Sequence, residues 1–117
     1  NGLYCLNGIV FPYYDTASSV EKEWWDSFKN KFDYEPNTGA AYGYIFADLF
    51  IEAIERAGQD LNIDSFVSAM ESIVDYLDPL ETSTVSFSET SRQGSNVSYF
   101  FQVKDERFEV ISGPISY

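Results

Sequence analysis

Residues 38–58 read TGAAYGYIFADLFIEAIERAG, and this stretch decides how the rest of the chain is interpreted. Apolar residues recur in it at the spacing of one face of an α-helix. The apolar face consists of Ala41, Ile45, Leu49, Ala53 and Ala57, widened by Phe46, Phe50 and Ile54. Gly58 follows, and helices commonly end on a glycine. We therefore expect a helix over 39–57 that is covered on two sides, because more than half of its girth is apolar.

A second helix is expected directly upstream, over 19–33. Ser18 and Glu21 have the spacing of a capping box, in which each side chain bonds the other residue's backbone N–H. Trp24 and Phe28 then lie on one apolar stripe. Trp25 lies about 100° away around the helix axis, so we expect it to cover another part of a larger protein or a contact between two copies.

Residues 3–11 predict a buried strand, because Ile9-Val10-Phe11 are apolar without alternation and Pro12 stops the run. A run of this kind favours a strand covered on both faces, as in a parallel sheet. Beyond the long helix, apolar residues at helical spacing predict a third helix over 64–77, with Asp64 as its N-cap.

The last third of the chain alternates between apolar and polar residues, which predicts strands near 84–88, 97–104 and 107–111, the last two forming a hairpin. The order of one strand, three helices and further strands predicts an α/β fold with a small sheet. The residues expected in its core are Trp24, Phe28, Ile45, Leu49, Phe66, Met70, Phe87 and Phe101.

Composition excludes several function classes. The 117 residues suffice for one domain, and 7 Lys and Arg against 19 Asp and Glu give a net charge of −12. Such a chain is repelled by phosphate backbones, so nucleic acid is not an expected partner. There is no histidine, and Cys5 is the single cysteine, which removes His-based catalysis and cysteine metal cages. We expect no catalytic residue, no metal and no cofactor.

One alternative function is a small calcium-binding module. Asp60, Asn62, Asp64 and Glu71 fall at the first, third, fifth and twelfth places of an EF-hand loop. Ser65 occupies the sixth place, where the sharp turn of that loop favours glycine. The competing interpretation is a linker followed by an Asp64 N-cap.

Candidate ligand-binding residues follow the first strand and begin the long helix. Tyr13, Tyr14 and Asp15 occupy the loop after that strand, where α/β proteins bind ligands. A tyrosine offers a flat apolar face and one hydroxyl group. Tyr42 lies in the first turns of the long helix, where free N–H groups favour an anion such as a carboxylate.

Four blocks in the right order resemble the type I periplasmic binding proteins, and within them the Leu/Ile/Val-type solute-binding components of ABC transporters. The most extensive block is Ala40-Ala41-Tyr42-Gly43-Tyr44 with Glu52-Ala53-Ile54-Glu55-Arg56-Ala57-Gly58. The others are the segment from Val20 to Glu35-Pro36, Thr84-Val85-Ser86-Phe87 with Arg92-Gln93-Gly94, and Tyr99 with Gln102-Val103-Lys104-Asp105. The chain departs from the family pattern at Ile45, Ser83 and Ser91.

The resemblance implies that residues 1–117 are the C-terminal part of a two-lobed, Rossmann-like protein. It implies extracytoplasmic binding of amino acids or similar solutes for uptake through an ABC transporter permease, without enzyme activity. A membrane receptor or sensor ectodomain with the same fold is the other implied possibility. By position in the family fold, Thr38, Gly39 and Tyr42 join Tyr13, Tyr14 and Asp15 as cleft residues.

A fragment of such a protein has uncovered faces. We expect the first strand to have an open edge, and Trp25, Tyr13 and Tyr14 to lack a covering layer. The chain alone is therefore predicted to self-associate, with a homodimer as one form, because open edges and apolar patches pair with other chains. It is also predicted to bind amino acids weakly, because one wall of a cleft buries too little of a small ligand.

Overall fold

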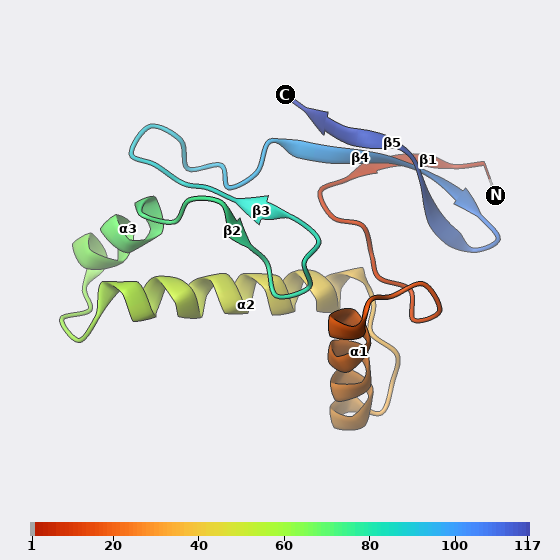
Figure 1. The fold of residues 1–117 in the computed structure, drawn as a ribbon, viewed down its shortest axis with the longest axis horizontal. Coiled ribbons are helices and arrows are strands. Elements are labelled where there is room, and N and C mark those ends of the chain that lie inside the picture. Colours follow the sequence, from red (N-terminus) through yellow and green to blue (C-terminus); the bar gives the residue numbers. More distant parts are fainter. Residues whose placement is uncertain (1) are drawn as a thin grey trace.

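Strand β1 near the N-terminus and strands β4 and β5 near the C-terminus form one small sheet. The helices come between β1 and β4 in the sequence and lie to one side of this sheet (Figure 1). A computed structural model describes residues 2–117. The elements of these residues are β1 (Tyr4–Asn7), α1 (Ser19–Phe32), α2 (Thr38–Ala57), α3 (Ile63–Glu71), β2 (Tyr76–Leu77), β3 (Thr84–Val85), β4 (Val97–Lys104) and β5 (Arg107–Ser116). This arrangement confirms an α/β fold with three helices, a small sheet and a C-terminal hairpin.

The first two helices lie where the sequence predicts them. The capping box of α1 is present, with Ser18 N–H donating to Glu21 at 2.6 Å and Glu21 N–H donating to the Ser18 hydroxyl group at 3.3 Å. In α2, Asn37 is the N-cap, and its side chain accepts from Ala40 N–H at 3.0 Å. Gly58 ends α2 with φ of 76°, a conformation in which glycine has no steric penalty.

The third helix is shorter than predicted. It begins after Asn62, which is the N-cap in place of the predicted Asp64, and it ends at Glu71 instead of reaching residue 77. Ile73 and Val74 are β-branched and favour extended backbone, and Asp75 adopts a positive φ of 50°, which stops the helix. The prediction used only the spacing of apolar residues, which does not take these local backbone preferences into account.

Part of the segment predicted as helix is instead strand β2, which the sequence did not indicate. Tyr76 and Leu77 pair antiparallel with Val85 and Thr84 of β3. The Tyr76 hydroxyl group donates to the Asp48 carboxylate of α2 at 2.6 Å. This hydrogen bond raises the pKa of Tyr76 to about 12, because the ionised phenol would face a carboxylate. The bond fastens β2 to α2.

The first strand differs from its prediction in length, burial and direction. β1 covers Tyr4–Asn7 only, pairs antiparallel with β4, and has alternately exposed and half-buried side chains. The prediction of a buried parallel strand over 3–11 was therefore wrong for these residues. A run of apolar side chains does not specify the direction of the partner strand. Residues beyond Asn7 leave the sheet, and Ile9 joins the helical core.

The C-terminal strands form a three-stranded antiparallel sheet in the order β1-β4-β5. β4 has the predicted bounds, whereas β5 extends to Ser116 instead of ending near residue 111. Pro114 is tolerated there because β5 is an edge strand and needs no donor on its open side. The strand predicted over 84–88 is limited to Thr84–Val85, because its partner β2 has only two residues.

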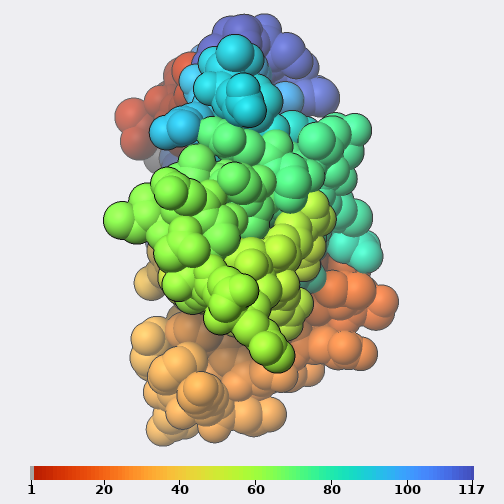
Figure 2. Space-filling model, turned by 90° about the vertical axis from the view of Figure 1, so that its left-hand side faces the viewer, coloured from red at the N-terminus to blue at the C-terminus, as the bar shows by residue number. Residues whose placement is uncertain are grey.

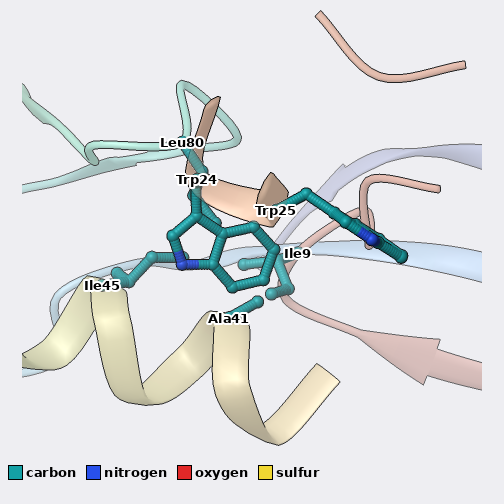
Figure 3. Packing of buried hydrophobic residues seen from close by; sticks show 6 residues of the cluster. All are labelled: Ile9, Trp24, Trp25, Ala41, Ile45 and Leu80. Atoms are coloured by element: carbon teal, nitrogen blue, oxygen red, sulfur yellow. The ribbon is translucent and has the colours of Figure 1, made fainter. Parts of the chain in front are cut away.

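The core lies between α1, α2 and the loop that contains Leu80. Figure 3 shows the Trp24 indole over Ala41 and Ile45 of α2, with Leu80 beside it and Trp25 projecting to one side. Among the predicted core residues, Trp24, Ile45 and Phe101 are buried. The remaining five are only half-buried: Phe28, Leu49, Phe66, Met70 and Phe87.

Trp25 is also buried, contrary to the expectation that it lacks a covering layer. Its ring lies 5.6 Å from the Phe11 ring and 6.0 Å from the Tyr14 ring, centroid to centroid. Its indole N–H donates to Glu35 at 2.6 Å. The chain itself covers Trp25, so this residue gives no reason for a contact between two copies.

The molecule is extended for its length. Its radius of gyration is 16.1 Å, whereas a compact domain of this length has about 13 Å. In Figure 2 the sheet and α1 lie at opposite ends, with α2 and α3 between them. Within residues 2–117, the helices are all too short or too polar to cross a membrane.

Candidate ligand-binding site

A cavity of about 310 Å³ lies where the three-stranded sheet meets the loop after β1 and the start of α2. We call it the junction pocket. Its walls are formed by Cys5, Leu6, Asn7, Ile9, Phe11, Thr38, Phe101 and Phe108. Small-molecule sites are typically cavities of this size or larger, mainly apolar and with a few convergent polar groups. The junction pocket has this composition.

The aromatic walls come from segments far apart in the chain. Cys5 of β1 lies opposite Phe101 of β4, and Phe101 lies opposite Val110 of β5. The rings of Phe101 and Phe108 meet edge-on with 6.4 Å between centroids. Phe11 contributes the third ring from the loop after β1. The alternation in residues 97–104 predicted Phe101 as a buried residue, but strand register was needed to place Phe101 in a pocket.

The polar end of the junction pocket is formed by Thr38 and Asn7. Thr38 is the first residue of α2, where the backbone N–H groups of the first turn and the positive end of the helix dipole favour an anion. The Asn7 side-chain oxygen accepts from the Tyr42 hydroxyl group at 2.5 Å and from Gly8 N–H at 3.0 Å. These two bonds fix the orientation of the Asn7 amide.

Two of the six predicted site residues therefore bear on the pocket at this end. Thr38 lines it directly, and Tyr42 acts through Asn7. Gly39 does not line it, and its α-carbon faces the cap instead. A β-carbon at Gly39 would lie 3.2 Å from the Asn37 side-chain oxygen, so the glycine leaves room for the cap of α2.

Tyr13 and Asp15 lie beside the opposite end of the pocket, where they contact β5. The Asp15 carboxylate accepts two hydrogen bonds from Arg107, at 2.8 and 2.7 Å. Arg107 holds the pKa of the Asp15 carboxyl group below its ordinary value. The Tyr13 hydroxyl group accepts from Phe108 N–H at 2.9 Å. The side chains of Tyr13 and Asp15 thus bond to β5, and neither of them lines the pocket.

Tyr14 is not part of the pocket. Its ring packs against Trp25, and its hydroxyl group donates to Asp26 at 3.4 Å. The ring is largely exposed on the side of α1. The structure therefore brings Thr38, Tyr42, Tyr13 and Asp15 to the margins of one pocket and leaves Tyr14 and Gly39 outside it.

A larger hollow of about 650 Å³ lies between α1 and α2. Trp24, Phe28, Phe32 and Tyr44 supply its aromatic surface, and none of the six predicted site residues lines it. Its walls come from α1, α2 and Pro79 of the loop between β2 and β3, and Trp24 is also a core residue. The junction pocket is the better candidate, because it joins the sheet to the helical part and has fixed polar groups at one end.

The residues of the EF-hand pattern have other partners. The Asn62 side chain caps α3 and bonds to the Asp60 backbone, and Glu71 forms an ion pair with Arg92 at 2.8 Å. Across residues 2–117, no three or more acidic or cysteine side chains come close enough to hold a metal ion.

The chain belongs to the periplasmic binding protein family, whose sequence profile matches residues 1–107. No curated protein matches it. Among solved structures, it is similar to a leucine-binding protein from Thermotoga maritima, with 20% identity and a TM-score of 0.67. That match covers 95% of this chain and 30% of the Thermotoga protein.

Two further structures share the fold. A branched-chain amino-acid ABC transporter protein from Thermus thermophilus with bound valine is 13% identical, with a TM-score of 0.79 over 99% of this chain and 34% of that one. A solute-binding protein from Rhodopseudomonas palustris in complex with 3,4-dihydroxybenzoic acid is 23% identical, with a TM-score of 0.65 over 92% of this chain and 28% of that one. The chain thus spans about a third of the length of these structures.

Proposed function

We propose that this chain binds a small organic solute of the amino-acid type in the junction pocket. The observation that carries the proposal is the pocket itself, which combines three aromatic walls with a polar end at Thr38 and Asn7. Family membership favours this function over the calcium-binding alternative. Binding involves no covalent chemistry and no cofactor, and the chain is not an enzyme.

The chemistry of the pocket indicates the class of solute. Phe11, Phe101 and Phe108 offer apolar contact to an aliphatic or aromatic group. Thr38 and the first turn of α2 offer hydrogen-bond donors to a carboxylate. Valine and 3,4-dihydroxybenzoic acid, which are bound in two of the similar structures, each carry a carboxylate, beside an isopropyl group in valine and a benzene ring with two hydroxyl groups in the acid. These solutes support an apolar carboxylate as the ligand class.

The chain acts, in this proposal, as the C-terminal part of a two-lobed protein. Its accessible surface is 7646 Å², against about 6,500 Å² for a compact monomer of 13.3 kDa. On α2, Phe46, Phe50 and Ile51 are 60%, 54% and 54% exposed. We call these three residues the outer face of α2. The sequence predicted that α2 is covered on two sides. Within residues 2–117 the side of α2 with Ala41 and Ile45 is buried and the outer face is not. In this proposal, further polypeptide of the same protein covers the outer face.

The whole protein then operates outside the cytoplasm and delivers its solute to an ABC transporter permease. The similar transporter-associated proteins support this placement. Solute bound between two lobes draws them together, and a permease distinguishes the closed from the open form. A receptor ectodomain of the same fold remains the alternative, and transport of the bound solute by cells that carry the gene distinguishes the two.

The direct test is a thermal-shift screen of the full-length protein that contains this chain, against amino acids and small aromatic acids. A ligand at one hundred times its dissociation constant stabilises a protein by about 2.7 kcal/mol, so binding raises the melting temperature. Thr38→Val removes a donor to the carboxylate and is expected to weaken binding about tenfold or more. Thr90→Val, in an exposed loop, is the matched control. If a solute binds the wild-type protein and the Thr38→Val variant with the same affinity, the proposed site is wrong.

A further inference from the structure

The junction pocket is assembled from two parts of the chain that touch at few places. Cys5, Asn7, Phe101 and Phe108 come from the sheet, whereas Ile9 and Phe11 come from the loop after β1, which packs against the helices, and Thr38 comes from the start of α2. In the part of the chain that the structure describes, the helices meet the three-stranded sheet through side chains, and no Cα atom of a helix lies within 8 Å of a Cα atom of this sheet. Side-chain links between the two parts therefore decide how the pocket walls sit relative to each other.

One of these links is a compact set of contacts between the loop after β1 and the start of β5. Asp15 accepts two hydrogen bonds from Arg107, at 2.8 and 2.7 Å. The same guanidinium group lies 4.9 Å from the centre of the Tyr13 ring. The Tyr13 hydroxyl group accepts from Phe108 N–H at 2.9 Å. We call Tyr13, Asp15, Arg107 and Phe108 the clamp.

The loop is shaped to present its side of the clamp. Thr16 N–H and the Thr16 hydroxyl group both donate to the Tyr13 carbonyl oxygen, at 3.0 and 3.2 Å. This closes a turn over residues 13–16 and places Tyr13 and Asp15 on the side that faces β5. The clamp therefore joins a turn to a strand, and each partner is held by its own hydrogen bonds.

The clamp lies at the opposite end of the pocket from the Asn7–Tyr42 link. Asn7 is level with Tyr99 on β4, and Phe108 is level with Val103. Four residues of strand separate these two levels, or about 13 Å. Phe108 and Phe11, which line this end of the pocket, both contact the clamp. Phe108 is a member, and the Phe11 ring meets the Tyr13 ring edge-on at 5.2 Å.

We propose that the clamp positions Phe11 against Phe108 across the junction pocket, and so sets both the access of solute to the pocket and its affinity. This role rests on the proposed function, since it concerns the same site. Tyr13, Asp15 and Arg107 are positioning residues. None of the three lines the pocket, and each acts through Phe11 or Phe108.

Two properties of the clamp follow from its chemistry. The ion pair is about half exposed on both sides, so salt weakens it. Both hydrogen bonds to Asp15 come from one nitrogen atom of Arg107, Nη1, while the planar guanidinium group lies over the Tyr13 ring. Lysine lacks a planar group that can lie on the ring, so Arg107→Lys keeps the charge but loses the contact with Tyr13 and loosens the clamp.

Cys5 provides a readout that needs no solute. It lines the pocket and is the single cysteine of the 117 residues. Cys5 is half-buried, so its alkylation by iodoacetamide in the full-length protein, followed by peptide mass spectrometry, reports how accessible the pocket is to a small reagent. We expect Asp15→Asn and Arg107→Lys to speed Cys5 alkylation about two- to fivefold, the range that corresponds to an exposed ion pair. Tyr13→Phe removes the acceptor for Phe108 N–H and should also speed it.

The matched control is Glu109→Gln. Glu109 pairs with Lys104 at 3.1 Å, on the same hairpin and with similar exposure, but this pair does not reach the loop. Added salt should speed alkylation of the wild-type protein and leave Asp15→Asn nearly unchanged. Equal alkylation rates in the wild-type protein and the clamp variants, or the same acceleration in Glu109→Gln, would overturn the proposal.

A titration with leucine or valine separates this proposal from the function it rests on. If the wild-type protein binds either one, the clamp variants should dissociate it faster while melting temperature in its absence changes little. Unchanged dissociation in variants with fast Cys5 alkylation overturns the role of the clamp in affinity. If neither solute binds, the alkylation rates still decide whether the clamp controls access.

Discussion

The Tyr42 hydroxyl group donates a hydrogen bond to the Asn7 side chain at 2.5 Å, across 35 residues of sequence. It joins α2 to the end of β1, and so fixes the polar end of the junction pocket to the sheet. Since no Cα atom of a described helix lies within 8 Å of a Cα atom of the three-stranded sheet, this side-chain bond is one of the direct links between α2 and the sheet.

Tyr42→Phe tests this link. The variant keeps the ring and removes the donor, so we expect a loss of about 1 kcal/mol in the free energy of unfolding, a typical net value for one hydrogen bond. Solute affinity should fall as well, because the Asn7 amide keeps only Gly8 N–H as a donor. Denaturant unfolding and solute titration measure the two effects. Tyr44→Phe is the control, since Tyr44 is 44% exposed and its ring lies beside Trp24 of α1, outside the junction pocket; equal effects of the two changes contradict the assignment.

The core can be tested at Leu80, which is 1% exposed and packs with Trp24. Leu80→Ala removes buried methyl groups and leaves a cavity, so we expect a loss of about 2–5 kcal/mol in unfolding free energy. Leu77→Ala, at a leucine that is 49% exposed, should cost less than about 1 kcal/mol. Denaturant titration compares the two. A small loss at Leu80 would mean that the loop over Trp24 is not part of the core.

How far the sequence predicts this fold differs from element to element. Helices α1 and α2 carry long periodic stripes and clear caps, and they were predicted within one residue at each end. The third helix was overextended, because Phe66, Met70, Ile73 and Leu77 keep helical spacing while Asp75 breaks the backbone at a positive φ. The spacing of apolar residues indicates which side chains lie on one face of a helix, but it does not indicate where the helix ends.

The candidate site was predicted in part for a related reason. Thr38 could be chosen from the sequence because helix caps mark a helix N-terminus, and the structure places Thr38 in the pocket lining. Tyr13 and Asp15 could be chosen because they follow a predicted strand, and they lie beside the pocket without lining it. Asn7, Phe101 and Phe108 line the pocket through the pairing of β1, β4 and β5, and strand register across more than 90 residues carries no local signal. Tyr14 stays a predicted site residue, and the structure places its ring against Trp25 and away from the junction pocket, because neighbouring loop residues point in different directions.

The environment of Trp25 predicts a pH dependence. Lys29, and then the Trp25 indole N–H, lower the pKa of the Glu35 carboxyl group below its ordinary 4.5. A lowered folded-state pKa contributes stability above the unfolded pKa, and this stability is lost as the pH falls through the folded value. The tryptophan fluorescence, to which Trp24 and Trp25 both contribute, should therefore change below pH 4.5. The difference between the wild-type protein and Glu35→Gln isolates this step, and an identical pH profile in both proteins contradicts it.

The outer face of α2 predicts the behaviour of residues 1–117 in isolation. Phe46 and Ile51 are exposed and apolar, so the isolated chain should self-associate at raised concentration. Phe46→Gln with Ile51→Gln should reduce the association measured by sedimentation velocity. Leu3→Gln with Leu6→Gln tests the β1 edge in the same way. A wild-type chain that stays monomeric at every concentration contradicts the proposal that further polypeptide covers this helix.

The central claim, that the junction pocket holds the solute, is tested most directly by protection of Cys5. The full-length protein is alkylated with iodoacetamide in the presence and absence of a solute that raises its melting temperature. Cys5 lines the pocket, so a saturating solute should slow its alkylation at least about tenfold, since binding at [L] well above Kd leaves few empty pockets. A solute that stabilises the protein but leaves the rate of Cys5 alkylation unchanged places the binding site elsewhere and contradicts the account.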